Sequence, residues 1–295
     1  MLSRVSFVNV LSVSNCGKMS DTLLKYGFSY NQLIDKGTLI DCSKVETIKN
    51  WLCMDQLPQL TKEQIVLFLI SCDDDVDFTK VTIKAYFSIK YNNNDVFNNR
   101  KVSDDDVQKA LDVGSICVWP RKTSGGYAIM RYAFKSSEYW KWNLKQATKI
   151  AFMAIESVIF DYPVQGLIVL IDLKNVSLGH LMQLRPGPLK VLIDYFQDAL
   201  PVKLISIHGF NSPWFLNQIL AIILPFMKQE LFEKISFHPK NIDWDNFYKQ
   251  HVPKEMMCKD YGGDFLLCDE IEKLTIEKFA SMKEYFEIEE ALRRI

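Results

Sequence analysis

The feature that most constrains this chain is an unbroken aliphatic run, Leu167-Ile168-Val169-Leu170-Ile171. A strand exposed on one face alternates apolar and polar residues, whereas a continuous run of five aliphatic side chains is typical of a strand buried on both faces. Such a strand needs covering layers above and below it. The run therefore predicts an α/β fold with a largely parallel sheet.

The segments around this run repeat a strand–helix pattern. Each expected strand is followed by a segment with apolar residues at three- and four-residue spacing, as in a parallel unit with a right-handed crossover. The expected order is β-α-β-α-β-α-β in an open sheet. The strands are expected at 127–134, 167–171, 202–207 and 235–237, with helices at 139–160, around Leu189–Phe196 and at Trp214–Lys228.

The remaining segments suggest four regions in a chain of 295 residues. Residues 1–44 show no strong period and are expected to be an irregular extension. A helical N-terminal lobe is predicted over 45–100, where Thr61 and Gln64 have the spacing of a capping box and the Asn-rich stretch 91–100 is interpreted as a linker. A larger α/β domain is expected over 101–268, beginning with a helix capped by Ser103. A polar helical tail follows over 269–295.

Charge and cysteine content exclude several classes of protein. Thirty-five Lys and Arg balance 36 Asp and Glu, so the net charge is -1 and nucleic acid is not an expected partner. The seven cysteines are scattered without a C-x-x-C pair, whereas a disulfide framework or zinc ribbon has paired spacing. We interpret them as small buried hydrophobes in a reducing compartment, which favours a cytoplasmic protein.

One stretch resembles a membrane span but is interrupted. Residues 204–227 contain no Asp, Glu, Lys or Arg, yet His208 to Pro213 divides them. The uniformly apolar part, 214–227, is shorter than the roughly 20 residues that cross a bilayer. We do not expect the opening 20 residues to form a signal peptide, because Asn9 and several serines interrupt their apolar stretch.

No motif indicates catalysis, a cofactor or a metal. Asp73, Asp75 and Asp77 alternate as in an EF-hand, but Phe78 and Lys84 stand where that loop needs Gly and Glu. The chain has no nucleophile elbow, phosphate-binding loop or paired histidines. Asp172 ends the buried strand, where α/β enzymes often keep an acid, but lacks a recognisable partner. We therefore expect a protein that is not an enzyme. The histidines are expected to be hydrogen-bonded structural groups: His180, His208, His238 and His251.

The segment after Pro213 is anomalous because it is apolar almost all round. A surface helix of an α/β domain should be amphipathic. One explanation is a core helix buried on every side; the other is a helix with one face on a hydrophobic cavity and the other on a membrane. One broad face carries Phe215, Ile219, Ile222, Ile223 and Phe226, and the opposite side carries Trp214, Leu220, Leu224 and Met227.

Several motifs stand in the order and spacing of a known family. These are Gly166 to Leu173, Ser177 to Leu181, Pro201-Val202-Lys203, Ile207-His208, Asn211 to Trp214, Pro225-Phe226, Pro253-Lys254-Glu255 and Asp260 to Gly263. With them the chain resembles the CRAL-TRIO lipid-binding family, in the branch of alpha-tocopherol transfer protein and cellular retinaldehyde-binding protein. The similarity covers about residues 45–290.

The resemblance implies a helical lobe followed by a lipid-binding lobe, whose hydrophobic pocket is closed by a gate helix at 214–228. It also implies a basic headgroup cleft, but here only Lys203 matches, while Ile205 and Glu230 replace expected cations. A phosphate clamp needs several converging cations, so we expect weak phosphoinositide docking, with Lys228 and Lys234 contributing. The predicted gate and pocket residues are Trp214, Phe215, Ile219, Ile222, Ile223, Phe226, Ile168, Leu170, Leu192 and Phe196.

The expected function is non-enzymatic binding and transfer of a small hydrophobic lipid of the retinoid, tocopherol or phospholipid class. The protein would be cytoplasmic and peripheral on membranes, with a membrane surface as transient partner. The alternative is a regulatory module that kept the fold, lost its cargo and binds a protein partner. A third hypothesis is an enzyme that acts on a lipid, but the sequence shows no evident pair of nucleophile and base.

Overall fold

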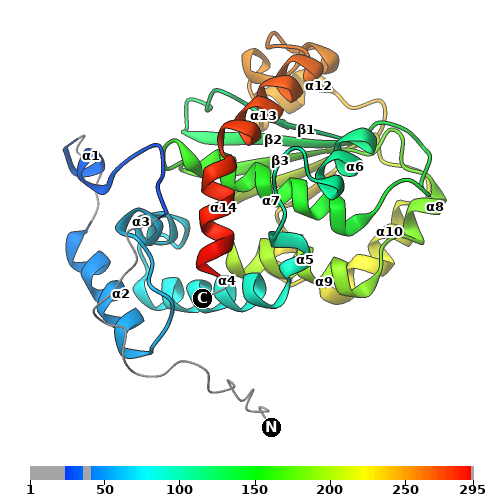
Figure 1. Cartoon of the computed structure of the whole chain (residues 1–295). Helices are drawn as coiled ribbons and strands as arrows, with labels where there is room; N and C mark the ends of the chain where they lie inside the picture. Colours follow the sequence, from blue (N-terminus) through cyan, green and yellow to red (C-terminus); the bar gives the residue numbers. More distant parts are fainter. Residues whose placement is uncertain (1–23, 36–40, 294–295) are drawn as a thin grey trace.

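The computed structural model describes residues 24–35 and 41–293 and contains one five-stranded sheet with the order β1-β2-β3-β4-β5 (Figure 1). β1 pairs antiparallel with β2, and the other three pairings are parallel. The predicted α/β class and the four parallel strands are therefore confirmed. β1 was not anticipated; it is the antiparallel edge. The strands are β1 Gly114–Val118, β2 Tyr127–Phe134, β3 Gly166–Asp172, β4 Leu204–Phe210 and β5 Ile235–Phe237.

The consecutive strand order determines where the connecting helices lie. When each parallel strand lies beside the one before it and every crossover is right-handed, all connections fall on the same face of the sheet. Side chains of α7, α9 and α10 meet one sheet face, and all three elements line one cavity there. These connections are α7 Leu144–Phe160, α8 Leu178–Leu181, α9 Pro186–Asp194 with a π-helical turn Tyr195–Ala199, α10 Leu216–Ile223 with a 3₁₀ turn Leu224–Phe226, and α11 Gln229–Phe232.

The long helix α7 starts later than the sequence pattern indicated. The expected start was residue 139, but Asn143 caps the helix, and its Oδ1 accepts hydrogen bonds from the backbone N–H of Lys145 and Gln146. An Asn side chain satisfies these otherwise unpaired donors. Thirteen of its 17 residues are buried. α7 is thus the central helix of the main core.

The N-terminal helical lobe forms as predicted, with one addition. Thr61 and Gln64 make the expected capping box. The stretch expected to be a linker contains a short helix whose Val96 and Phe97 are buried. The described part of the segment expected to be irregular, residues 1–44, contains one short helix and the first residues of a second. These elements are α1 Tyr30–Asp35, α2 Cys42–Met54, α3 Lys62–Ser71, α4 Val76–Asn92 and α5 Asn94–Phe97. The next helix, α6 Asp105–Val113, packs on α7 and β1, and its N-cap is Asp104 and not Ser103.

The C-terminal elements cover the second sheet face and return to the N-terminal lobe. α13 packs on β1 and α7, while α14 reaches toward α4 and α5 (Figure 1). Tyr285, Phe286 and Glu289 of α14 are buried, so the expected tail is an integral layer. These elements are α12 Trp244–Gln250, two 3₁₀ turns Lys254–Met256 and Lys259–Tyr261, α13 Cys268–Ser281 and α14 Lys283–Leu292.

A fully buried ion network joins the N-terminal lobe to α7 and α14. Lys90 Nζ lies 2.6 Å from Glu156 Oε1 and 2.9 Å from Glu289 Oε1. Arg100 pairs with both glutamates, through Nη1 at 2.8 Å from Glu156 Oε2 and through Nη2 with Glu289. Arg293 adds a third cation, with Nε 2.9 Å from Glu289 Oε1. Because buried charges are tolerated only when paired, this network fixes the three elements relative to one another.

Candidate functional site

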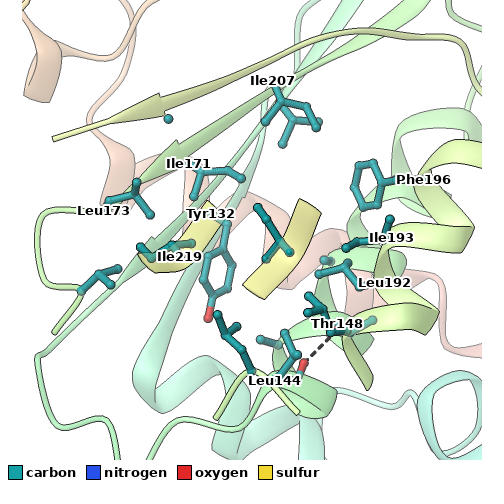
Figure 2. A pocket seen from close by; sticks show the side chains of 18 of the residues that line it. Tyr132, Leu144, Thr148, Ile171, Leu173, Leu192, Ile193, Phe196, Ile207 and Ile219 are labelled. Atoms are coloured by element: carbon teal, nitrogen blue, oxygen red, sulfur yellow. Dashed lines mark hydrogen bonds between the residues drawn. The ribbon is translucent and has the colours of Figure 1, made fainter. Parts of the chain in front are cut away.

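A cavity of about 280 Å³ lies between the sheet and the helices that connect its strands (Figure 2). Side chains of β2, β3 and β4 form one wall, and α7, α9, the π-helical turn and α10 form the others. Figure 2 shows Ile171 and Ile207 of the strands on one side of this space and Ile193 and Phe196 on the other. The lining residues include Met130, Tyr132, Phe134, Val169, Ile171, Leu173, Ile207, Leu144, Thr148, Leu189, Leu192, Ile193, Phe196, Ile219 and Ile223.

The cavity wall is apolar, and its few polar groups are already engaged within the protein. Its lining contains no Asp, Glu, Lys or Arg among the described residues. The Tyr132 hydroxyl accepts a hydrogen bond from Trp142 Nε1 at 2.7 Å, and Thr148 Oγ1 donates to the Leu144 carbonyl at 2.8 Å. Burial lowers the pKa of His180, whose Nδ1 accepts from the Ser177 N–H, so this ring is neutral at pH 7. A bound molecule would therefore contact apolar surface and no charged side chain of the cavity wall.

Helix α10 forms one side of this cavity without being buried itself. None of its residues is fully buried, although it is almost wholly apolar. Ile219 and Ile223 line the cavity, while Trp214, just before the helix, is 81% exposed and Leu224, just after it, is 40% exposed. The core-helix explanation for this segment is therefore wrong. The helix separates an apolar space from solvent.

The two ends of α10 are constrained differently. Before the helix, Asn211 adopts a left-handed conformation (φ 55°) and its Nδ2 donates to Asp172 Oδ1 at 2.8 Å. Phe215 is only 4% exposed and anchors this end. After the helix, Pro225 lies in an exposed 3₁₀ turn, which ends the α-helix earlier than the predicted residue 228. The left-handed Asn211 and the proline-restricted turn therefore mark the two boundaries of the helical segment.

Four predicted site residues line the cavity and the other gate residues do not. Leu192, Phe196, Ile219 and Ile223 are in the wall. Ile222 is half-buried against the main core. Phe226 is also half-buried and borders a separate surface groove with Ala85 and Lys190.

Ile168 and Leu170 lie on the face of the sheet opposite the cavity, which corrects their predicted place in the pocket. Both belong to a second core cluster with Phe210 and Tyr261. Side chains alternate along a strand, so their neighbours Val169 and Ile171 point to the cavity. A fully apolar strand hides this alternation in the sequence. The two adjacent strands could have revealed it, because Arg131 of β2 and His208 of β4 both pair with Leu170 and mark the non-cavity face.

Lys203 lies in a cleft outside the cavity, where it is already paired. Its Nζ is 2.7 Å and 2.8 Å from the two carboxylate oxygens of Asp73. Lys228 in the same cleft pairs with Asp198, and Glu230 also borders it. Each of these two cations therefore has an acidic neighbour. Lys234 also lines the cleft and has no ion pair among the described residues, so it is the one of the three expected cations that is not already paired.

Asp172 and three histidines have structural partners on the non-cavity side. Asp172 Oδ2 accepts from the Tyr261 hydroxyl at 2.8 Å, and its Oδ1 accepts from the Lys174 N–H at 2.9 Å. His208 Nδ1 lies 3.1 Å from His238 Nε2, and the His251 ring centroid is 4.4 Å from that of His208. Burial, followed by the two neighbouring histidines, lowers the pKa of His208 to about 3. The scattered histidines thus form a neutral cluster that sequence spacing did not reveal.

A membrane span does not occur among the described helices, since none combines the necessary length with sufficient apolar character. This finding agrees with the interpretation of residues 204–227, which form β4, α10 and the turn between them.

Comparison with known proteins places the cavity-forming region in a family. A model described as "CRAL/TRIO domain" matches residues 112–263, just over half of the chain. Clavesin-1 of Rattus norvegicus is 27% identical over 183 residues, covering 61% of this chain and 51% of the relative. Clavesin-2 of Homo sapiens is 25% identical over 183 residues, covering 61% and 55%. The matched region thus spans about half the length of these relatives. The crystal structure of Sfh5 matches with a TM-score of 0.48 at 13% identity, over 71% of this chain and 74% of that one.

Proposed function

We propose that this chain, which belongs to the CRAL/TRIO domain family, binds the apolar part of a small lipid in its cavity and carries it between membranes. The observation that carries the proposal is an uncharged cavity closed on one side by an apolar helix with no fully buried residue. The proposed action involves no covalent chemistry. Its proposed location is the cytoplasm, peripheral on membranes.

The energetic benefit of such a cavity follows from its apolar wall. Each buried methylene group is worth about 0.8 kcal/mol, so a lipid with about twenty methylene equivalents faces a cost of about 16 kcal/mol on entering water. A cavity without charged groups removes most of this cost. The lipid then has a similar free energy in the cavity and in the bilayer, which allows the protein both to load and to release it.

The volume and the wall limit the class of cargo. The cavity, at about 280 Å³, is slightly smaller than the roughly 300–1,000 Å³ of small-molecule sites. It is suited to a single hydrocarbon chain or a compact ring system, and a polar headgroup would lie at its mouth. Membership of the tocopherol and retinaldehyde carrier branch stays a prediction. Retinoid, tocopherol and phospholipid classes therefore all stand as candidates.

Movement of α10 would connect the cavity with a membrane. The exposed Trp214 and Leu224 flank the helix, and tryptophan is favoured at the boundary of a bilayer. Contact with a bilayer would remove the apolar outer side of α10 from water. The turn Asn211–Pro213 and the turn at Pro225 would absorb the backbone change.

Phosphoinositide docking would contribute little to this cycle. The ion pairs of Lys203 with Asp73 and of Lys228 with Asp198 would have to open before either cation met a phosphate. We expect attachment to depend mainly on the apolar residues around α10.

Solvent extraction of the purified protein followed by mass spectrometry tests the proposal. The expected result is a lipid at near-equimolar amount, displaced when Ile223→Trp fills the cavity. Asn217→Ala on the exposed side of α10 is the matched control and should retain the lipid. A folded protein that yields no lipid and moves none between vesicles would contradict the proposal.

The paired cations of the cleft favour one alternative, a module that lost its cargo and binds a protein partner. That alternative predicts no lipid after extraction and no effect of Ile223→Trp, with binding lost instead when the exposed Trp214 is replaced. The same purification therefore separates the two functions.

A further inference from the structure

Three cysteines distant in sequence meet on the non-cavity side of the sheet. Cys117 lies on β1, Cys258 precedes the 3₁₀ turn Lys259–Tyr261, and Cys268 is the first residue of α13. All three are buried, and none is in a disulfide. Cys258 Sγ, Cys268 Sγ and a carboxylate oxygen of Asp260 lie within 4.8 Å of one another. Cys117 Sγ is 3.3 Å from the Cys268 carbonyl oxygen, at the edge of this group.

The loop that holds the group is fixed by its own backbone. The N–H groups of Tyr261 and Gly263 donate to the Cys258 carbonyl, at 3.0 and 3.1 Å. Gly262 provides the left-handed conformation (φ 76°) that this tight turn needs. The Cys268 N–H donates to Asp260 Oδ2 at 2.7 Å, which joins the two ends of the loop. The donor atoms therefore converge without a metal.

The chemistry of this donor set selects a soft divalent cation. Thiolate ligands favour zinc, whereas magnesium and calcium need oxygen ligands. Zinc takes four ligands at tetrahedral positions, at about 2.3 Å from sulfur and about 2.0–2.2 Å from carboxylate oxygen. We infer that Cys258, Cys268 and Asp260 form a structural zinc site, and that Cys117 becomes the fourth donor when its thiol turns from the Cys268 carbonyl toward the other three.

The surroundings favour the negative charge that such a site carries. The Arg131 guanidinium lies beside it, with Nη1 3.8 Å from Cys117 Sγ. Cys268 stands at the N-terminus of a 14-residue helix, where the backbone dipoles stabilise a thiolate. Asp260 is exposed while the thiols lie behind it, so a metal can enter from the Asp260 side.

The site is independent of the proposed lipid function. None of its four residues lines the cavity, which is on the other face of the sheet. Its effect would be to hold the 258–268 loop and the start of α13 to the edge strand β1.

Metal analysis of the full chain tests the inference. The protein, purified under reducing conditions with zinc present and then gel-filtered, should carry equimolar zinc. Cys258→Ser and Cys268→Ser should each lose it. Cys72→Ser is the matched control, because Cys72 is buried elsewhere with its Sγ 3.4 Å from Thr82 Oγ1; this variant should keep its zinc.

If the serine variants fail to fold, a second measurement on the wild-type chain tests the zinc site. Cobalt added to the metal-free wild-type chain should give thiolate-to-cobalt charge-transfer absorption, and Asp260→Asn should weaken the binding by about tenfold or more. Zinc well below equimolar together with no cobalt absorption would overturn the inference. So would a Cys258–Cys268 disulfide found by mass spectrometry in freshly purified, metal-free protein.

Discussion

Helices α7 and α10 lie on the same face of the sheet and are both rich in apolar residues, yet their environments are opposite. Thirteen of the 17 residues of α7 are buried, and its Glu156 belongs to the ion network that joins three parts of the fold. In α10 no residue is fully buried. The comparison teaches that apolar content does not determine burial. α7 borders the cavity along one part of its surface and is packed elsewhere, whereas α10 lies between the cavity and solvent.

The two helices should therefore respond differently to substitution. In α7 the neighbouring atoms are packed, so changes in volume or charge act on stability. In α10 the same kinds of change should act on cargo and membrane contact, since a cavity lies on one side and solvent on the other.

The largest effect is expected at Glu156 of α7. Glu156→Ala leaves Lys90 and Arg100 buried with one glutamate between them, which should lower the free energy of unfolding by about 3–5 kcal/mol. Chemical denaturation measures this change. Lys145→Ala on the exposed side of α7 removes only a surface pair with Asp95 and should cost no more than about 1 kcal/mol. Equal losses in the two variants would contradict the assigned role of the network.

Acid should weaken the same network through Glu289. Burial raises the pKa of this carboxyl, but Lys90 and Arg100 outweigh burial and lower it from 4.5 to about 2. A lowered pKa means that its stabilisation is complete above pH 4.5 and is lost as pH falls toward 2. The loss should be about 3 kcal/mol. Denaturation across this pH range should show a decline that Glu289→Gln flattens; an unchanged decline in that variant would refute the assignment.

Enlarging a side chain compares the two helices directly. Ala154→Leu in α7, at a fully buried position, should cost about 1–3 kcal/mol by overpacking. Ile223→Trp in α10 can extend into the cavity and should cost less than about 1 kcal/mol, while reducing bound lipid about tenfold or more. Thermal unfolding and lipid extraction measure the two effects. If Ile223→Trp destabilises as strongly as Ala154→Leu, the space beside α10 is not available to cargo.

A charge on the exposed side of α10 should affect transfer but not folding. Leu224→Asp places a carboxylate where contact with the bilayer is proposed, and transfer between vesicles should slow about tenfold. Because Leu224 is exposed, the free energy of unfolding should change by no more than about 0.5 kcal/mol. Leu224→Ala is the control for size alone. A matching loss of folding would mean that this residue packs in the core.

The smallest effect is expected at Lys203. Its ion pair with Asp73 is solvent-exposed, and such pairs contribute at most about 1 kcal/mol. Lys203→Ala should leave association with anionic vesicles almost unchanged, as measured by sedimentation. Asp73→Ala is the more informative partner variant, because it frees Lys203 and should increase that association. If Lys203→Ala greatly reduced association with anionic vesicles, the cleft would bind a lipid headgroup, contrary to this expectation.

Patterns of local origin were predictable from the sequence. The aliphatic run 167–171, the capping box at Thr61 and the interrupted stretch 204–227 each depend on neighbours within a few residues, and each has the expected structure. The motifs also identified the family, and the unusual apolar helix drew attention to one wall of the cavity.

Features that depend on the third dimension were missed. The two faces of β3 are equally apolar, so Ile168 and Leu170 could not be distinguished from Val169 and Ile171. β1 is a short edge strand whose pairing with β2 determines its conformation. The histidine and cysteine clusters join residues far apart in the chain, and no spacing rule brings Cys117 near Cys268.

The ion network has a consequence for how the chain folds during synthesis. Lys90 and Glu289 are 199 positions apart in the sequence. A ribosome that has just released the N-terminal lobe and α7 has produced Lys90, Arg100 and Glu156, but not the second glutamate. Until α14 emerges, two cations share one carboxylate at a site that excludes water in the finished protein. The junction therefore closes only after α14 has been synthesised, when the second carboxylate is present to pair with both cations.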